Sequence, residues 1–235
     1  MIPNIIAVTL LAGFASGLLY GLLNILFVTP YIEKATELEA IRSGFNLGPE
    51  YFAYRTWQLQ GGLLAALLVG IAYSALYTLV YILSKSIDKG VKRAVMLALI
   101  IWMVIYLVPA IKYPANPPGV GEPDTIYYRQ IIFVTYLLVS SISALALALI
   151  RTRLTNSNNR IKRDVIIITT YSLIMFTAYI LMPNNPDPIN TDSSILLGFR
   201  VSSALTVLVL WLMLGLTSSL LWSKSGLVKR RISLN

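Results

Sequence analysis

The chain alternates long apolar stretches with short polar links. Six windows contain no Asp, Glu, Lys or Arg, and they cover residues 1–32, 56–84, 94–111, 130–150, 165–186 and 201–223. A helix needs about 20 apolar residues to cross roughly 30 Å of hydrocarbon, and an open strand in lipid would leave its backbone groups unpaired. The pattern therefore predicts six transmembrane helices, at about 5–28, 58–83, 94–111, 130–150, 165–182 and 196–222.

Charge in the links predicts how these helices are oriented. Thirteen of the 19 basic residues follow the second, fourth and sixth spans, whereas eight of the ten acids lie in the other links. Cytoplasmic loops carry the excess of Lys and Arg. We therefore expect an all-α, polytopic membrane helix bundle of three hairpins, a single transmembrane domain over 1–235, with both the N and C termini in the cytoplasm.

Composition agrees with residence in a membrane. Hydrophobic residues make up 57% of the chain and charged residues 12%, whereas soluble domains carry about 25% charge. We expect a multi-pass protein of the cell membrane that contacts the lipid bilayer. The basic links explain the net charge of +9, so no nucleic-acid partner is expected.

Several absences argue against catalysis. The chain has no cysteine and no histidine, so it lacks thiol nucleophiles, thiolate metal sites and the commonest general base near neutral pH. It also lacks the G-x-x-x-x-G-K-[ST] and G-x-S-x-G motifs. We expect neither an enzyme nor a tightly bound cofactor.

The first span carries Gly13, Gly17 and Gly21 on one face. Small residues at this spacing let two helix backbones approach closely. They predict either packing inside the bundle or a face on which a partner helix docks.

The first outer link has the pattern of a short amphipathic helix lying along the outer surface. Thr29 and Pro30 are the residue types of an N-cap and a first turn, and Gly44 can end the helix. Glu33 and Glu37 lie four residues apart, so both carboxylates face the same way. The two carboxylates can bind a divalent cation, or they can be solvated or paired with basic neighbours.

The second and third outer links are rich in proline and acid. Residues 112–125 include Pro117, Pro118 and Gly119, which exclude helix, so their free carbonyls must face water, protein or an ion. The acids of the two links are Glu122, Asp124, Asp187 and Asp192. An ordered turn and a loop that handles or gates an ion both fit this composition.

Arg200 lies within the apolar run of the last span. An ionisable residue inside a span is costly, and it is usually paired or functional. Asp187 and Asp192 are the nearest acids in the sequence. We expect a carboxylate to hold Arg200 in a structural or gating role.

Several of these segments resemble a known family. Residues 112–126 read KYPANPPGVGEPDTI, which is similar to the signature of the CbtA family of predicted cobalt transporter subunits. Further likenesses are LAG at 11–13, VTP at 28–30, MP at 182–183, FR at 199–200 with Ser203, and Trp211. The resemblance implies a membrane component of a cobalt uptake system, paired with CbtB, a small single-span protein that carries histidines. Family members are usually described with fewer spans than the six expected here.

We predict a membrane subunit of an uptake system for a divalent metal ion, with cobalt as the substrate. The residues expected to bind the ion weakly where it enters are Glu33, Glu37, Glu122, Asp124 and Asp187. The alternative is a non-transporting structural or assembly subunit of a larger membrane complex.

Overall fold

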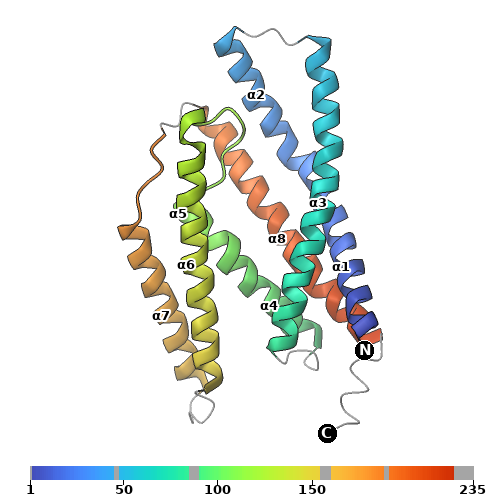
Figure 1. The fold of residues 1–235 in the computed structure, drawn as a ribbon, viewed down its shortest axis with the longest axis vertical. Coiled ribbons are helices and arrows are strands. Elements are labelled where there is room, and N and C mark those ends of the chain that lie inside the picture. Colours follow the sequence, from blue (N-terminus) through green and yellow to red (C-terminus); the bar gives the residue numbers. More distant parts are fainter. Residues whose placement is uncertain (1, 45–47, 85–89, 154–159, 188–190, 225–235) are drawn as a thin grey trace. The chain divides into compact units, whose positions relative to one another are not determined.

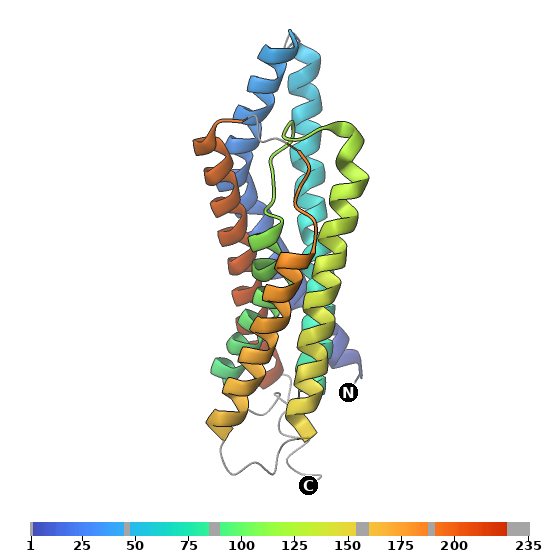
Figure 2. The same ribbon diagram turned by 90° about the vertical axis from the view of Figure 1, so that its left-hand side faces the viewer.

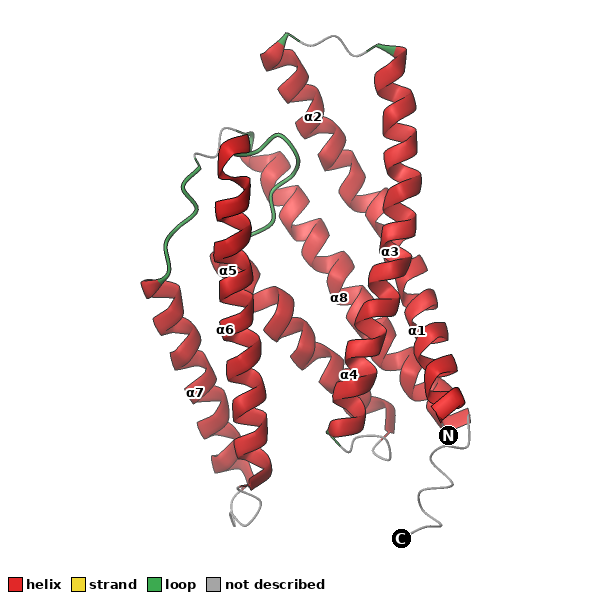
Figure 3. Cartoon of the chain, in the orientation of Figure 1, coloured by secondary structure: helices red, strands yellow, loops and turns green. Residues whose placement is uncertain are grey.

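The structure is a computed structural model, and it describes residues 2–44, 48–84, 90–153, 160–187 and 191–224 (Figure 1). Every regular element in this part of the chain is helical, and it contains no strand (Figure 3). The α-helices are α1 (Ile2–Leu23), α2 (Thr29–Ser43), α3 (Pro49–Leu83), α4 (Gly90–Trp102), α5 (Val108–Lys112), α6 (Ile126–Arg153), α7 (Arg160–Leu181) and α8 (Ser193–Lys224). The shorter elements are the π-helices η1 (Asn24–Val28) and η2 (Met103–Leu107) and the 3-10 turn η3 (Pro123–Thr125).

Six helical segments of the described chain are long and apolar enough to cross a membrane. They are Asn4–Ser43, Pro49–Leu83, Gly90–Lys112, Pro123–Arg153, Arg160–Leu181 and Ser193–Ser223. The prediction of an all-α protein with six spans is therefore confirmed, including the short third window, which forms a helix of 23 residues. The chain is a multi-pass integral membrane protein.

The link after the first predicted span differs from its prediction. α2 runs on from α1 through η1 as one segment of 40 residues, and it is not a separate surface helix (Figure 2). Thr29 is the first residue of α2 and not its N-cap, because its N–H donates to the carbonyl of Asn24 in the preceding π-helix. Gly44 ends α2 as predicted, in the left-handed conformation with φ of 68°.

By their contacts the helices form two compact units. Unit 1 holds the described residues of Met1–Trp102, Asn116–Gly119 and Thr191–Asn235. Unit 2 holds those of Met103–Ala115 and Val120–Asn190. A single domain over the whole chain stays a prediction.

In unit 1 the glycine face of α1 packs directly on α3. A Cβ added to Gly13 would lie 2.6 Å from Ile71 Cα, and one added to Gly17 would lie 2.7 Å from the Ala66 carbonyl oxygen. Both distances are too short for any side chain, so the two backbones are in contact. The prediction of packing inside the bundle is confirmed for this face.

Hydroxyl and aromatic groups complete the interior of unit 1. Ser74 Oγ on α3 donates to the Thr9 carbonyl on α1 over 2.7 Å. Trp211 of α8 stacks on Tyr73 of α3, with ring centroids 5.1 Å apart. Farther along, Trp222 stacks on Tyr81 at 4.3 Å. Large rings therefore fill the space between α3 and α8, while α1 packs against both helices.

In unit 2, α6 and α7 lie side by side, and η2 and α5 pack against α6. Ser140 of α6 is fully buried, and its hydroxyl donates to the Val104 carbonyl in η2 over 2.5 Å. The same hydroxyl lies 2.8 Å from the Tyr171 hydroxyl of α7. Nearby, Tyr136 donates to the Met175 carbonyl over 3.2 Å. Hydrogen bonds between helices thus hold unit 2 together inside the spans.

Candidate functional site

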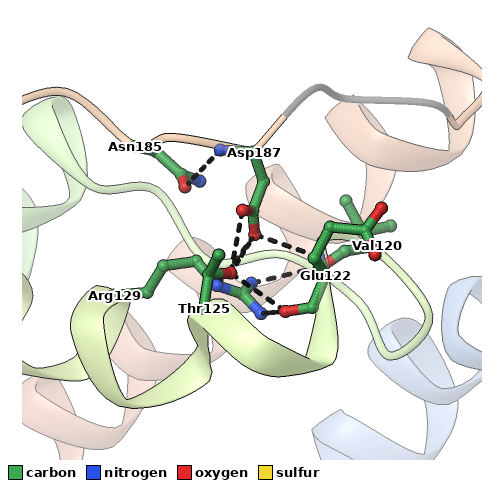
Figure 4. Close-up of polar contacts among 6 residues, drawn as sticks. All are labelled: Val120, Glu122, Thr125, Arg129, Asn185 and Asp187. Atoms are coloured by element: carbon green, nitrogen blue, oxygen red, sulfur yellow. Dashed lines mark hydrogen bonds and ion pairs between the residues drawn. The ribbon is translucent and has the colours of Figure 1, made fainter.

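A cluster of polar contacts in unit 2 joins the proline-rich link before α6 to the one after α7 (Figure 4). We call it the loop clasp, and it consists of Val120, Glu122, Thr125, Arg129 and Asp187. At its centre Arg129 Nε lies 2.9 Å from Asp187 Oδ2. The Asp187 side chain is only 4% exposed and that of Arg129 is 22% exposed. This ion pair is therefore largely shielded from solvent.

The other contacts of the loop clasp engage both oxygens of the Asp187 carboxylate. The Thr125 hydroxyl lies 2.8 Å from both carboxylate oxygens, and the Glu122 N–H donates to Oδ2 over 3.1 Å. Arg129 also donates to the carbonyls of Val120 and Glu122, over 3.3 and 3.0 Å. The sequence left water, protein or an ion as partners for the carbonyls of this link. For these two carbonyls the structure shows protein. These contacts favour a structural role for Asp187.

Gly121 makes the loop clasp possible. Its φ is 96°, a conformation that side chains with a Cβ rarely adopt. A Cβ at this position would also lie 2.6 Å from Arg129 Nη1 and would run into the carboxylate of Asp187. Gly121 is therefore needed both for the backbone conformation of the turn and for the space that the ion pair occupies.

A second tie joins the same two links. The Tyr113 hydroxyl donates to the Pro183 carbonyl over 2.5 Å, and burial raises the pKa of Tyr113, so the hydroxyl keeps its proton. Lys112 Nζ donates to Asn184 Oδ1 over 2.6 Å. The same ammonium lies 4.6 Å from the centre of the Tyr179 ring, within the range of a cation–π contact.

Arg200 belongs to unit 1, where its guanidinium donates to Asn116 Oδ1 over 2.7 Å. The partner shown is thus a neutral amide, whereas the sequence had indicated Asp187 or Asp192. Asp187 is engaged by Arg129, and Asp192 accepts the Ser194 N–H over 2.7 Å at the start of α8. Asn116 lies 84 positions from Arg200 in the sequence. A carboxylate partner of Arg200 stays a prediction.

The remaining residues of the proline motif also contribute to unit 1. Pro117 is fully buried, Pro118 is exposed, and Gly119 has a φ of 77°. A Cβ on Gly119 would collide with the carboxylate of Glu39 on α2. Sequence reasoning did not select Glu39, because nothing near it marks the contact. The glycines of the motif were the available signal, since each marks a close backbone approach.

The candidate metal ligands lie in different surroundings. Glu33 and Glu37 are exposed on α2, and within the described residues neither has an ion pair. Glu122 and Asp124 are also exposed, whereas Asp187 is buried in the loop clasp. The described part of the chain contains no group of three or more acids placed to hold a metal ion. The ligand set stays a prediction.

These observations define an α-helical, multi-pass membrane protein whose proline-rich links are held by specific polar contacts. The chain belongs to the CbtA family, because the family model, described as probable cobalt transporter subunit, matches residues 2–223. The resemblance seen at residues 112–126 is thus confirmed. No curated protein and no solved structure matches the chain. The family is one of transporter subunits and not of enzymes, and a subunit has at least one partner.

Proposed function

We propose that the protein is the membrane subunit of an uptake system for a divalent metal ion, with cobalt as the substrate. The family description supports transport of cobalt. One observation supports the place where the ion first binds: Glu33 and Glu37 are exposed one turn apart on α2, and neither is neutralised by an ion pair within the described residues.

The chemistry of these ligands makes the site weak. Without histidine and cysteine, the chain offers a first-row metal only oxygen ligands and Met sulfur. Carboxylates bind hard cations but discriminate poorly among divalent first-row ions, because imidazole or thiolate usually secures the later metals. Two carboxylates leave most of the coordination shell to water. Weak binding also suits transport, since an ion that is held too tightly cannot leave.

Glu122 and Asp124 are a second exposed pair, at the edge of the loop clasp in unit 2. In this proposal they are a second weak binding site for the ion. We give Asp187 the structural role of holding Arg129, because three groups, the Arg129 guanidinium, the Glu122 N–H and the Thr125 hydroxyl, already contact its carboxylate.

Selection among metals falls to a partner. We propose a small, single-span, histidine-bearing subunit of the CbtB type, which supplies the imidazole that this chain lacks. The family description as a subunit supports a partner of some kind.

Uptake into the cell from a site at these acids requires the acids to be outside and both termini to be cytoplasmic. Cysteine can be placed at Asp124 and at Thr152, two exposed positions, without background from other thiols. A membrane-impermeant thiol reagent applied to intact cells is expected to label position 124 and not position 152. The reverse labelling would invert the topology and refute the proposed path.

The metal site is tested by calorimetry on the purified chain without a partner. Co²⁺ is expected to bind weakly, to be displaced by Mg²⁺ or Mn²⁺, and to lose most of its affinity in the Glu33→Gln/Glu37→Gln variant. Glu50→Gln is the control, because it removes another exposed acid and is expected to leave binding unchanged. Tight, cobalt-selective binding by this chain alone would refute the proposal.

One observation favours the alternative of a structural or assembly subunit. Among the described residues, the fully buried polar ones are serines and threonines, so the spans offer the ion no buried carboxylate. If the purified chain binds no Co²⁺, and cells with the complete system take up cobalt normally despite Glu33→Gln/Glu37→Gln, the structural role is supported instead.

A further inference from the structure

Among the described residues of unit 1, three that are fully buried each have a polar side-chain atom without a hydrogen-bond partner in the protein. The atoms are Ser16 Oγ on α1 and Trp211 Nε1 and Ser218 Oγ on α8. All three residues are 0% exposed. Buried polar groups in folded proteins are nearly always bonded, to protein or to ordered water. Three exceptions on two helices that pack together therefore need an explanation.

Neighbouring hydroxyls show that the exceptions are not a general property of these helices. Thr9 on α1 donates to the carbonyl of Ile5 over 2.8 Å, and Thr217 on α8 donates to that of Met213 over 2.6 Å. This bond to the preceding turn is the usual solution for a hydroxyl in a transmembrane helix. Ser16 and Ser218 do not use it. Their hydroxyls are thus left for a partner that comes from outside the helix.

We infer that the interior of unit 1 binds ordered water, which bonds to Ser16 on α1 and to Trp211 and Ser218 on α8. An indole N–H can only donate, whereas a serine hydroxyl can donate and accept. Water matches both kinds of group, because it donates and accepts as well. These groups are therefore complementary to small neutral ligands that form hydrogen bonds.

A bare divalent cation does not fit the same place. The unpartnered groups are neutral, and the buried polar residues described in unit 1 include no carboxylate. A charge taken out of water without an opposite charge nearby is strongly disfavoured. The inference goes beyond the proposed function, and it stands whether or not this chain binds cobalt.

Thermal unfolding of the purified full chain gives the first test. If water bonds to the hydroxyls, Ser16→Ala and Ser218→Ala remove a hydrogen bond, and each is expected to lower Tm by roughly 2–4 °C. If the hydroxyls are dry and unpaired, alanine removes a buried unsatisfied group, so Tm rises or stays the same. Ser140→Ala is the matched control, because Ser140 is equally buried but bonded, and its Tm must fall. A rise or no change at both Ser16 and Ser218 would overturn the inference.

The second test observes the indole of Trp211 directly. In NMR spectra of protein labelled with ¹⁵N at its tryptophans, the Trp211 signal is assigned by its loss in Trp211→Phe. Transfer of magnetisation from water to the Trp211 N–H is expected, although the side chain is fully buried. Trp57, which is 65% exposed, is the positive reference. Transfer at Trp57 without transfer at Trp211 would show a dry core. Neither test involves metal, so its outcome is distinct from that of the cobalt experiments.

Discussion

The helices within unit 1 and the helices within unit 2 are held together by different kinds of contact. In unit 1, the backbones of α1 and α3 are in contact at the glycines of α1. In the most apolar stretch of α8, 44% of the residues are buried. In unit 2, α7 has only 6% of its most apolar stretch buried, and it is joined to its neighbours by hydrogen bonds from Tyr136 and Ser140 and by the loop clasp. One unit relies on close packing and the other on particular polar contacts.

The difference follows from the physics of helices in lipid. Burial of apolar side chains does not drive association there, because lipid tails are as apolar as leucine. Helices then associate through backbones close enough for dispersion attraction, or through polar groups that lipid cannot satisfy. Unit 1 uses mainly the first solution and unit 2 mainly the second. The stability of unit 1 should therefore be most sensitive to the size of a substituted side chain, and that of unit 2 to the loss of a hydrogen bond.

The largest effect is expected for Gly17→Leu in unit 1. The leucine would have to displace the α3 backbone near Ala66, at a cost of roughly 3 kcal/mol or more and about 10 °C in Tm. Gly62→Leu is the matched control, since a Cβ at Gly62 meets nothing within 4 Å. Thermal unfolding in detergent measures both variants. Equal melting profiles for the two would contradict the close contact.

Asp187→Ala tests the loop clasp of unit 2, with the next largest effect expected. Arg129 would lose its carboxylate in a shielded position, at a cost of about 2 kcal/mol and roughly 5 °C in Tm. Asp124→Ala removes an exposed acid from the same link and should change stability by less than about 0.5 kcal/mol. A double-mutant cycle with Arg129→Ala should be strongly non-additive. Additive effects would show that the pair contributes nothing.

Arg200→Leu should have a smaller effect, about 1 kcal/mol, because the hydrogen bond to Asn116 is lost. Arg200→Lys keeps the charge and a donor, so it should preserve more of the folded protein. Asn116→Ala should reproduce the part of the loss that comes from this bond, and it should add little in the Arg200→Leu background. Full tolerance of leucine would mean that the guanidinium merely extends towards the polar interface.

The smallest effect is expected at Asp192, the exposed cap of α8. Hydrogen bonds from the Ser194 side chain and N–H lower the pKa of Asp192. The stabilisation is therefore present above the unfolded pKa of about 4 and is lost as the pH falls through the lower pKa of the folded state. Asp192→Asn should keep the cap and lose this pH dependence, whereas Asp192→Ala should lose the cap at every pH. Unfolding curves between about pH 3 and 7 compare the three proteins. Identical curves would contradict the role of the cap.

Features set by local pattern were predictable from the sequence. The charge-free windows predicted the six spans, the four-residue spacing of Gly13, Gly17 and Gly21 predicted a packing face, and Gly44 ended α2. Each depends on residues that are close in sequence. Solvation in lipid makes this local signal strong, because one charge interrupts a span.

Features that join distant segments were not predictable. Thr125 and Asp187 meet although they are 62 positions apart, and no property of either residue indicates the other. The acids of the proline-rich links looked alike in sequence, yet Asp187 is buried while Glu122 and Asp124 are exposed. The π-helices had no compositional signal either, and the missed η1 explains why α2 was expected to be a separate helix.

The π-helix η1 also sets the rotational register of the first segment. A π-turn accommodates one extra residue in a helix, and each residue turns the following side chains by about 100°. The angle between the glycine stripe of α1 and the carboxylates of α2 therefore depends on η1. If the same residues 24–28 formed regular α-helix, Glu33 and Glu37 would turn together by about 100° relative to the glycine stripe.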